Sequence, residues 1–208
     1  KLDIYFTSNM EENKMYLNRG GFEFEDITKI SKTQGRNGPW KTGVTAVDIN
    51  GDQRMDLYVC YSGMLSEKKR RNQLFLNMGN DSNGIPQFTE VAKLYGLDSS
   101  AYSNQGYFFD YDQDGDLDML LLNHNPKSLP VLGVLKTKVL LKEDEPMTGL
   151  RLYEQKNKRF FDITSNTQIN GSSLSYGLGL ALSDFNNDGW IDFYLSNDYT
   201  IPDYLYIN

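Results

Sequence analysis

One nine-residue pattern occurs three times in this chain, each time between two apolar segments. The copies read DINGDQRMD from Asp48, DYDQDGDLD from Asp110 and DFNNDGWID from Asp184. They hold 11 of the 28 acidic residues of the chain. Like charges packed this closely repel one another. The fold must therefore place the same acidic turn in three equivalent positions and supply something that neutralises it.

Apolar segments flank every copy of this acidic loop. A Gly-containing segment precedes it (GVTAV, GYFF, GLGLALS), and a short apolar run follows it (LYVCY, MLLLN, FYLSN). Two further signatures recur later in the repeat, one of the type LYLN and one of the type FEDIT. Their alternation of apolar and polar residues predicts strands with one buried face. Each repeat is therefore predicted to be a unit of four antiparallel strands.

Four short strands that repeat every 62 to 74 residues, measured between the first aspartates of successive loops, predict a β-propeller. The expected fold is all-β, a partial propeller over residues 1–208 in which two complete blades are flanked by two partial ones. A propeller needs about four or more blades to close, so this arc is expected to be an excerpt of a longer protein. The blade parts are predicted at about 1–30, 43–92, 106–164 and 178–208.

An insertion at about 125–148 accounts for the longer interval between the second and third acidic loops. Its proline and charged residues predict a loop excursion, with one short strand at KTKVLL (136–141). Connections longer than about 12–15 residues are usually functional or disordered. The insertion, with its apolar run LPVLGVL, is therefore expected either to pack across its own propeller or to contact a partner.

Oxygen-bearing side chains occupy positions 1, 3, 5 and 9 of each acidic loop, and the carbonyl of position 7 is a natural fifth ligand. Such an all-oxygen set without His or Cys favours Ca²⁺ over zinc or copper, and Mg²⁺ rarely occupies an all-protein cage. Up to three Ca²⁺ would change the formal charge from −7 to −1. The predicted ligands are the side chains of Asp48, Asn50, Asp52, Asp56, Asp110, Asp112, Asp114, Asp118, Asp184, Asn186, Asp188 and Asp192, with the backbone carbonyls of Arg54, Asp116 and Trp190.

The acidic loops have two other interpretations. Asp-rich turns can simply cap backbone N–H groups without any ion, although three loops in the same register argue against this. An EF-hand needs a Glu at position 12 and helices on both sides. Position 12 here is Val59, Leu121 or Leu195, and the flanks are predicted strands. The EF-hand is therefore excluded.

The acidic loops, the Gly-rich strands before them and the LYLN and FEDIT strands resemble the FG-GAP/VCBS repeats of integrin-α-like β-propellers. DIYFTSNMEENKMYLN and GLGLALSDFNNDGWIDFYLSNDY are similar to the large VCBS-repeat surface proteins of Bacteroidetes-type bacteria. The resemblance covers the chain outside 125–148. It implies a calcium-loaded propeller, exported and often lipid-anchored through a segment outside this chain, that serves as a binding or scaffolding module.

One residue departs from the pattern of the other two loops. Gln53 stands where they have Gly115 and Gly189. If that position requires a positive φ, a residue other than glycine costs about 1 kcal/mol. The first calcium site is therefore expected to be the weakest.

Residues suited to catalysis are few. His124, the single histidine, is expected in a loop, and the single cysteine, Cys60, in the core. GSSLSYG (171–177) lacks the GxSxG spacing of a nucleophilic serine and fits an inter-blade loop. The basic run EKKRRN (67–72) is expected to be a solvated loop, so no nucleic-acid partner is expected. No apolar run approaches the roughly 20 residues of a membrane-spanning helix.

The sequence thus predicts a non-enzymatic, calcium-binding module of an exported or cell-surface protein. Extracellular calcium sites with a Kd of roughly 10⁻⁴ to 10⁻³ M would stand empty in the cytosol, which favours export. The favoured role is a protein–protein interaction scaffold in an outer-membrane assembly, in contact with protein partners or with the remaining blades of a longer parent chain. The alternative is a glycan-binding module of a polysaccharide-uptake or adhesion system, in which Trp40, Trp190 or Tyr199 stacks on sugar rings.

Overall fold

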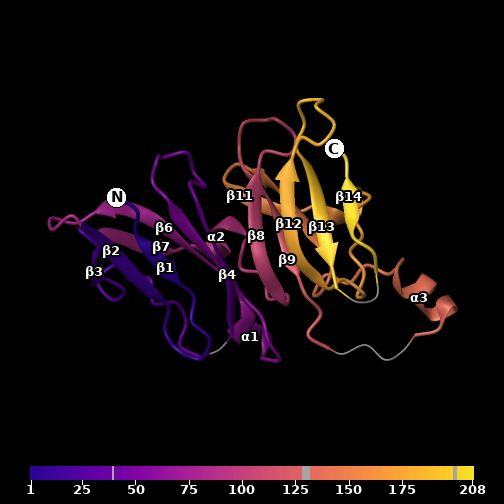
Figure 1. Ribbon diagram of the computed structural model, residues 1–208, viewed down its shortest axis with the longest axis horizontal. Helices are drawn as coiled ribbons and strands as arrows, with labels where there is room; N and C mark the ends of the chain where they lie inside the picture. The colour runs from indigo at the N-terminus through magenta and orange to yellow at the C-terminus, as the bar shows by residue number, and fades with distance from the viewer. Residues whose placement is uncertain (39, 128–131, 199–200) are drawn as a thin grey trace.

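The computed structural model describes residues 1–38, 40–127, 132–198 and 201–208, which form four antiparallel sheets that follow one another in chain order (Figure 1). The predicted division into three, four, four and three strands is confirmed within these residues. The first sheet contains β1 (Ile4–Phe6), β2 (Lys14–Gly20) and β3 (Glu23–Asp26); the second contains β4 (Lys41–Val47), β5 (Asp56–Tyr61), β6 (Gln73–Asn80) and β7 (Pro86–Glu90). The third contains β8 (Ser103–Phe109), β9 (Asp118–Asn123), β10 (Arg151–Lys156) and β11 (Arg159–Asp162); the fourth contains β12 (Gly177–Ser183), β13 (Asp192–Asn197) and β14 (Tyr204–Tyr206).

Short helical segments lie in the connections within the sheets, as α1 (Glu67–Arg70) and α3 (Val134–Leu140), and between them, as α2 (Ala92–Tyr95) and the 3₁₀ turn η1 (Thr164–Asn166). Within the described residues, no helix combines the length and the apolar character that crossing a membrane requires.

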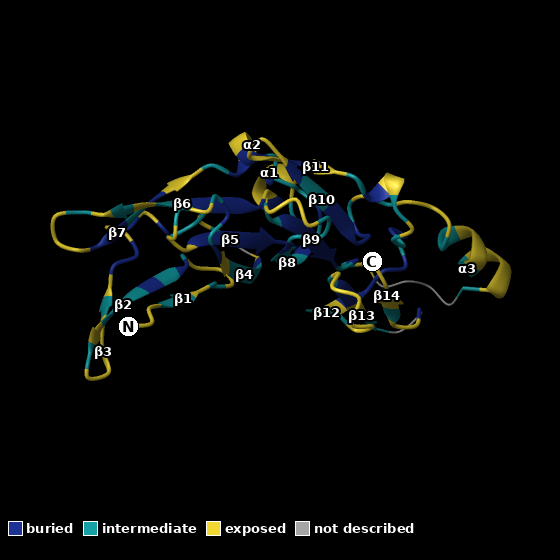
Figure 2. Cartoon of the chain, turned by 90° about the horizontal axis from the view of Figure 1, so that it is seen from above, coloured by how far each residue is buried: buried dark blue, intermediate teal, exposed yellow. Residues whose placement is uncertain are grey.

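The second strand of each four-stranded sheet is buried along its whole length (dark blue in Figure 2). Side chains alternate across a strand, so β5 serves two hydrophobic cores. Tyr58 and Cys60 enter the core shared with the third sheet, whereas Leu57 and Val59 enter the core shared with the first. The side chains of β9 alternate in the same way between two hydrophobic cores, one on each face of the third sheet. This two-sided burial is why LYVCY and MLLLN are apolar throughout.

The FEDIT signature ties the outer strand of a sheet to its neighbour. In the first sheet, the N–H and hydroxyl of Thr28 both donate to Oδ1 of Asp26, at 3.0 and 2.5 Å, and the Thr28 hydroxyl accepts the N–H of Met15 on β2. Asp162 and Thr164 repeat this arrangement in the third sheet. In the second sheet, where the sequence is FTEVA, Glu90 accepts the N–H of Ala92 directly. The signature therefore satisfies backbone donors where the outer strand ends.

The basic run at 67–72 is not the solvated loop that the sequence predicted. It contains α1, and Arg70 is buried. Its Nε donates to the carbonyl of Ser100 at 2.9 Å, and its guanidinium lies 4.2 Å from the centroid of the Tyr102 ring. A long basic side chain is buried here because carbonyl acceptors and an aromatic face are available to it.

The expected strand at 136–141 is also wrong, because these residues lie in and just after α3. The N–H of Thr137 donates to the Gly133 carbonyl, and the N–H of Leu141 donates to the Thr137 carbonyl, both at 3.0 Å. Leu and Lys are good helix formers, and no strand within the described residues pairs with this segment. Without a sheet edge to join, the local helical preference decides the conformation.

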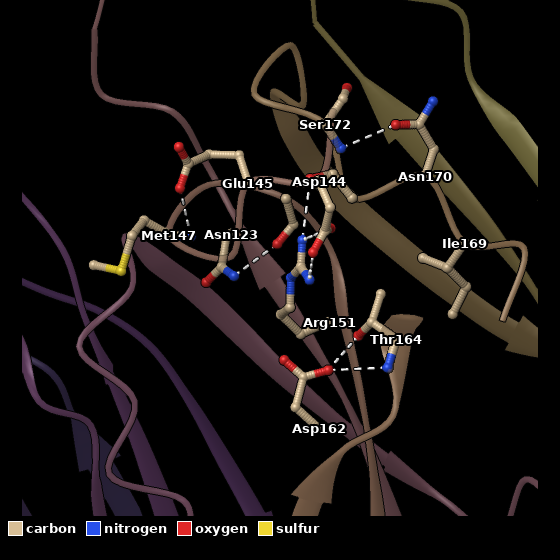
Figure 3. A network of polar contacts seen from close by, with 12 residues as sticks. Asn123, Asp144, Glu145, Met147, Arg151, Asp162, Thr164, Ile169, Asn170 and Ser172 are labelled. Carbon is tan, nitrogen blue, oxygen red and sulfur yellow. Dashed lines mark hydrogen bonds and ion pairs between the residues drawn. The ribbon is translucent and has the colours of Figure 1, made fainter. Parts of the chain in front are cut away.

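The end of the insertion is anchored to the third sheet by a buried arginine (Figure 3). Arg151, the first residue of β10, is almost fully buried and makes a two-pronged ion pair with Asp144 of the insertion, with its Nη1 2.9 Å from Oδ2. Its Nη2 also donates to the carbonyl of Gly171 at 3.0 Å. The same carbonyl accepts the N–H of Glu145. The insertion therefore packs on its own fold near Asp144, whereas α3 has no buried residue.

Candidate metal sites

The three acidic loops join the first and second strands of the second, third and fourth sheets, and all three lie along the same edge of the molecule (top of Figure 1). This placement follows from the repeat, because each loop is the turn of the same hairpin. The register is equivalent as well: Val47 pairs with Asp56, Phe109 with Asp118 and Ser183 with Asp192.

The loops share one hydrogen-bond pattern. In each, the N–H of position 6 donates to Oδ2 of position 1, and the N–H of position 7 donates to Oδ1 of position 5. The first bond measures 2.7 Å for Gln53–Asp48, 3.1 Å for Gly115–Asp110 and 2.9 Å for Gly189–Asp184. The second measures 2.9 Å for Arg54–Asp52, 3.0 Å for Asp116–Asp114 and 2.9 Å for Trp190–Asp188.

The aspartate at position 9 is buried and connects its loop to the third strand. Both oxygens of Asp118 accept backbone N–H groups, Oδ2 from Tyr111 at 3.1 Å and Oδ1 from Gln155 at 2.8 Å. Asp56 and Asp192 accept the equivalent pairs of bonds. This carboxylate therefore has a structural role, whatever else it binds.

The second loop brings three carboxylates together. Asp110, Asp112 and Asp118 each offer an oxygen, and these atoms lie within 4.8 Å of one another. Oδ1 of Asp110 is buried and has no hydrogen-bond partner among the described residues. Burial, with a contribution from Asp112 and Asp116, raises the pKa of Asp118 to about 7. A buried carboxylate oxygen without a donor, next to two further carboxylates, fits a hard divalent cation.

The first and third loops have Asn at position 3, and the Asn side chain donates a hydrogen bond to the aspartate at position 5. Asn50 donates from Nδ2 to Oδ2 of Asp52 at 3.0 Å, and Asn186 does the same to Asp188 at 2.7 Å. In the first loop, Nη2 of Arg54 also contacts Oδ2 of Asp52 at 2.6 Å. The sequence assigned Arg54 a role through its carbonyl alone and missed this internal cation.

Each loop has a positive φ at both position 4 and position 6. As the sequence argument required, Gln53 has a positive φ, of 66°. Position 4 of the same loop, however, is a glycine, Gly51, whereas the other loops place Gln113 (59°) and Asn187 (60°) there. Every loop therefore has two residues with a positive φ, of which one is a glycine and one is not. The strain at Gln53 is not particular to the first loop.

Two further contacts were not anticipated from the sequence. The side-chain amide of Gln113 donates to the carbonyl of Gly189 at 2.8 Å, so the second and third loops touch. Asp3 accepts the N–H of Asn18 at 2.9 Å, the same bond that position 9 makes to the third strand in the acidic loops. The signal for Asp3 was present, since LDIYF at the start of the chain parallels LDMLL and IDFYL.

The remaining residues considered in the sequence lie away from the acidic loops or outside the described part of the chain. Cys60 is buried in the core as predicted, and burial raises its pKa. His124 forms an antiparallel β-bridge with Tyr176, and the two rings pack edge to face with their centroids 5.2 Å apart. His124 therefore pairs like a strand residue rather than lying in a loop. Residues 171–176 lie in the connection between the third and fourth sheets, as expected, and Gly177 is the first residue of β12. Tyr199 lies outside the described residues.

This fold, with one acidic hairpin turn repeated along a row of antiparallel sheets, defines a repeat protein. Residues 1–59 match the family model described as an FG-GAP-like repeat. The chain therefore contains an FG-GAP-like repeat, as the resemblance implied. The matched segment includes Asp3 and the first acidic loop and ends within β5. No curated protein matches the chain.

Proposed function

We propose that this chain is a calcium-binding, non-enzymatic part of a β-propeller from an exported or cell-surface protein. The four sheets are its blades, and each acidic loop holds one Ca²⁺ through the side chains of positions 1, 3, 5 and 9 and the carbonyl of position 7. The FG-GAP-like repeat and the four antiparallel sheets support this proposal. Export follows from the weakness of such sites, which cytosolic calcium would not fill.

The observation that carries the calcium proposal is the second acidic loop. The carboxylates of Asp110, Asp112 and Asp118 converge within 4.8 Å, and one buried oxygen of Asp110 lacks any donor among the described residues. Without a cation, such an arrangement combines repulsion with the cost of a desolvated charge. A bound Ca²⁺ removes both.

Isothermal titration of the full chain with Ca²⁺ tests this proposal. We expect binding to more than one site, and we expect Asp110→Asn to remove or strongly weaken one of them. Glu143→Gln, which changes the charge equally on an exposed residue of the insertion, is the matched control and should leave the titration unchanged. No heat of Ca²⁺ binding, or equal titrations for both variants, would refute the proposed sites.

The same module is proposed to act as a scaffold that contacts a protein partner through α3. Leu135, Val134 and Val139 on this helix are 82%, 71% and 56% exposed. The base of the insertion is held by the ion pair between the buried Arg151 and the exposed Asp144, so the fold presents these apolar side chains outward from a fixed support. Residues 129–131 of the apolar run lie outside the described residues.

Partner recovery from native membranes tests the scaffold role. The double variant Leu135→Ser/Val139→Ser should melt like the unmodified chain but recover less of the partner that the intact protein recovers. Lys138→Ser, an exposed change on the same helix, is the control and should leave recovery unaffected. Equal recovery by all three proteins would show that α3 is not the contact.

A further inference from the structure

A pocket of about 390 Å³ opens at the end of the molecule opposite the acidic loops, where the first strands of three neighbouring sheets begin. Thr42 of β4, Asn104 of β8 and Leu178 of β12 all line it. Strand β4 is seven residues long, so the pocket lies roughly 20 Å from the acidic loops. A ligand bound here would not touch the proposed calcium ions.

Trp40 gives this pocket an aromatic wall. Its side chain packs against Gly63, where an added Cβ would lie only 3.0 Å from Cγ of the indole. The N–H of Ser62 donates to the Trp40 carbonyl at 3.0 Å, which fixes the backbone beside the ring. The residue nevertheless remains 48% exposed. An indole supported by glycine on one side and open to solvent elsewhere is a platform on which a flat apolar surface can stack.

Uncharged polar groups surround this platform. Asn104 Nδ2 and His124 Nδ1 both lie 3.4 Å from the carbonyl of Gly177, at the long limit of a hydrogen bond. The hydroxyl of Ser62 and the second ring nitrogen of His124 have no hydrogen-bond partner within the described part of the chain. These groups can therefore exchange weak or absent bonds for bonds to a ligand.

The absence of charge decides the class of ligand. Charged residues make up 24% of the chain, yet none of the described residues that line the pocket is Asp, Glu, Lys or Arg. A phosphate, carboxylate or ammonium group would find no counter-charge here. An uncharged sugar has one apolar face of C–H groups and a rim of hydroxyls, and it matches an indole surrounded by neutral donors and acceptors. The volume also falls within the range of small-molecule sites, about 300–1,000 Å³.

We propose that this pocket binds an uncharged sugar residue, with Trp40 stacked on the apolar face of the ring and Ser62, Asn104 and His124 bonded to its hydroxyls. The site is separate from the acidic loops and gives the module a carbohydrate ligand in addition to its proposed protein partner.

The test is a screen of the full chain, at saturating Ca²⁺, on an array of neutral and anionic glycans. It is followed by a fluorescence titration with the methyl glycosides of glucose, galactose and mannose and with N-acetylglucosamine. At least one neutral sugar should bind and change the tryptophan emission. Trp40→Ala should weaken binding at least about tenfold, and Trp40→Tyr should restore part of it. Phe22→Ala, a change to an aromatic side chain that is 97% exposed and does not line the pocket, should leave the affinity unchanged.

Three results would overturn the proposal: no bound neutral glycan, binding confined to anionic glycans, or equal affinity for Trp40→Ala and the unmodified chain. The melting temperature of Trp40→Ala, measured with Ca²⁺, shows that the variant is folded. Because calcium binding is measured without sugar, failure of the sugar site leaves the calcium result intact, and the reverse also holds.

Discussion

The guanidinium of Arg54 lies 2.6 Å from Oδ2 of Asp52, within the same acidic loop. Its Nε also donates to the carbonyl of Asn77 on β6, at 3.0 Å, which holds the side chain over the loop. The equivalent residues of the other loops, Asp116 and Trp190, carry no positive charge. The first loop thus contains a cation of its own, in competition with any ion that Asp52 would bind.

Arg54→Gln should strengthen calcium binding at the first loop. The backbone carbonyl predicted as a ligand is retained, while the charge on Asp52 is freed. Because the ion pair is partly exposed, solvent screening limits the gain in affinity to about two- to fivefold. Isothermal titration measures it, with Lys68→Gln on α1 as a control for net charge. Unchanged affinity would show that Arg54 does not compete with calcium.

Position 1 and position 9 of the second loop should behave differently when each is substituted. Asp118→Ala leaves two backbone donors unpaired and should lower the free energy of unfolding by about 2–4 kcal/mol even in EGTA. Asp110→Asn should abolish or weaken the site while changing stability in EGTA by less than about 1 kcal/mol. Urea unfolding with and without Ca²⁺ separates the two effects. Similar losses in EGTA would argue against separate structural and ligand roles.

The bond from Gln113 to Gly189 should couple the second and third loops. Gln113→Ala removes this bond and should weaken calcium binding at the third loop by about two- to fivefold, since an exposed hydrogen bond contributes about 0.5–1 kcal/mol. Gln53→Ala, at a positive-φ position of the first loop, controls for changes in loop strain. Affinity at the third loop that is insensitive to Gln113→Ala would mean that the two loops bind independently.

Trimming the insertion should reveal which part of it holds the fold. Replacing 133–141 by a short Gly/Ser linker removes α3 but keeps Asp144, and it should change the melting temperature by less than about 2 °C. Asp144→Ala leaves the buried guanidinium of Arg151 without its carboxylate and should cost about 1–3 kcal/mol. The opposite ranking, with the trimmed chain less stable than Asp144→Ala, would show that α3 itself packs on the fold.

The sequence predicted the strand pattern because the same spacing recurs around each acidic loop. Fully apolar runs such as LYVCY marked one strand of each repeat, and the FEDIT signature marked the last one. That the apolar strand is buried on both faces was shown by the structure. Features that depend on contacts between distant segments were not predictable in this way. Arg70 is buried because the carbonyl of Ser100 and the ring of Tyr102 contact it. The segment of α3 is helical because none of the described strands pairs with it.

In the candidate sites too, the features set by local spacing were predictable and those set by side-chain contacts were not. Spacing alone placed the oxygen side chains of each loop at its ends and centre. It did not reveal that Arg54 turns back onto Asp52, since either solvent or a neighbouring carboxylate satisfies an arginine near a turn. In the first loop the glycine stands at position 4 instead of position 6, and only the backbone angles show that both positions have a positive φ. In the sequence, Gln53 looked like an isolated departure.

The central claim is that calcium occupies the acidic loops and stabilises the fold, and thermal unfolding of the full chain in Ca²⁺ and in EGTA tests it most directly. At a free Ca²⁺ concentration of ten times Kd, each occupied site adds about 1.4 kcal/mol to the free energy of unfolding. With all three loops filled, the melting temperature should therefore fall by about 8–16 °C in EGTA. Readdition of Ca²⁺, but not of Mg²⁺ at the same concentration, should restore it. Superimposable melting curves in Ca²⁺ and in EGTA would contradict the claim.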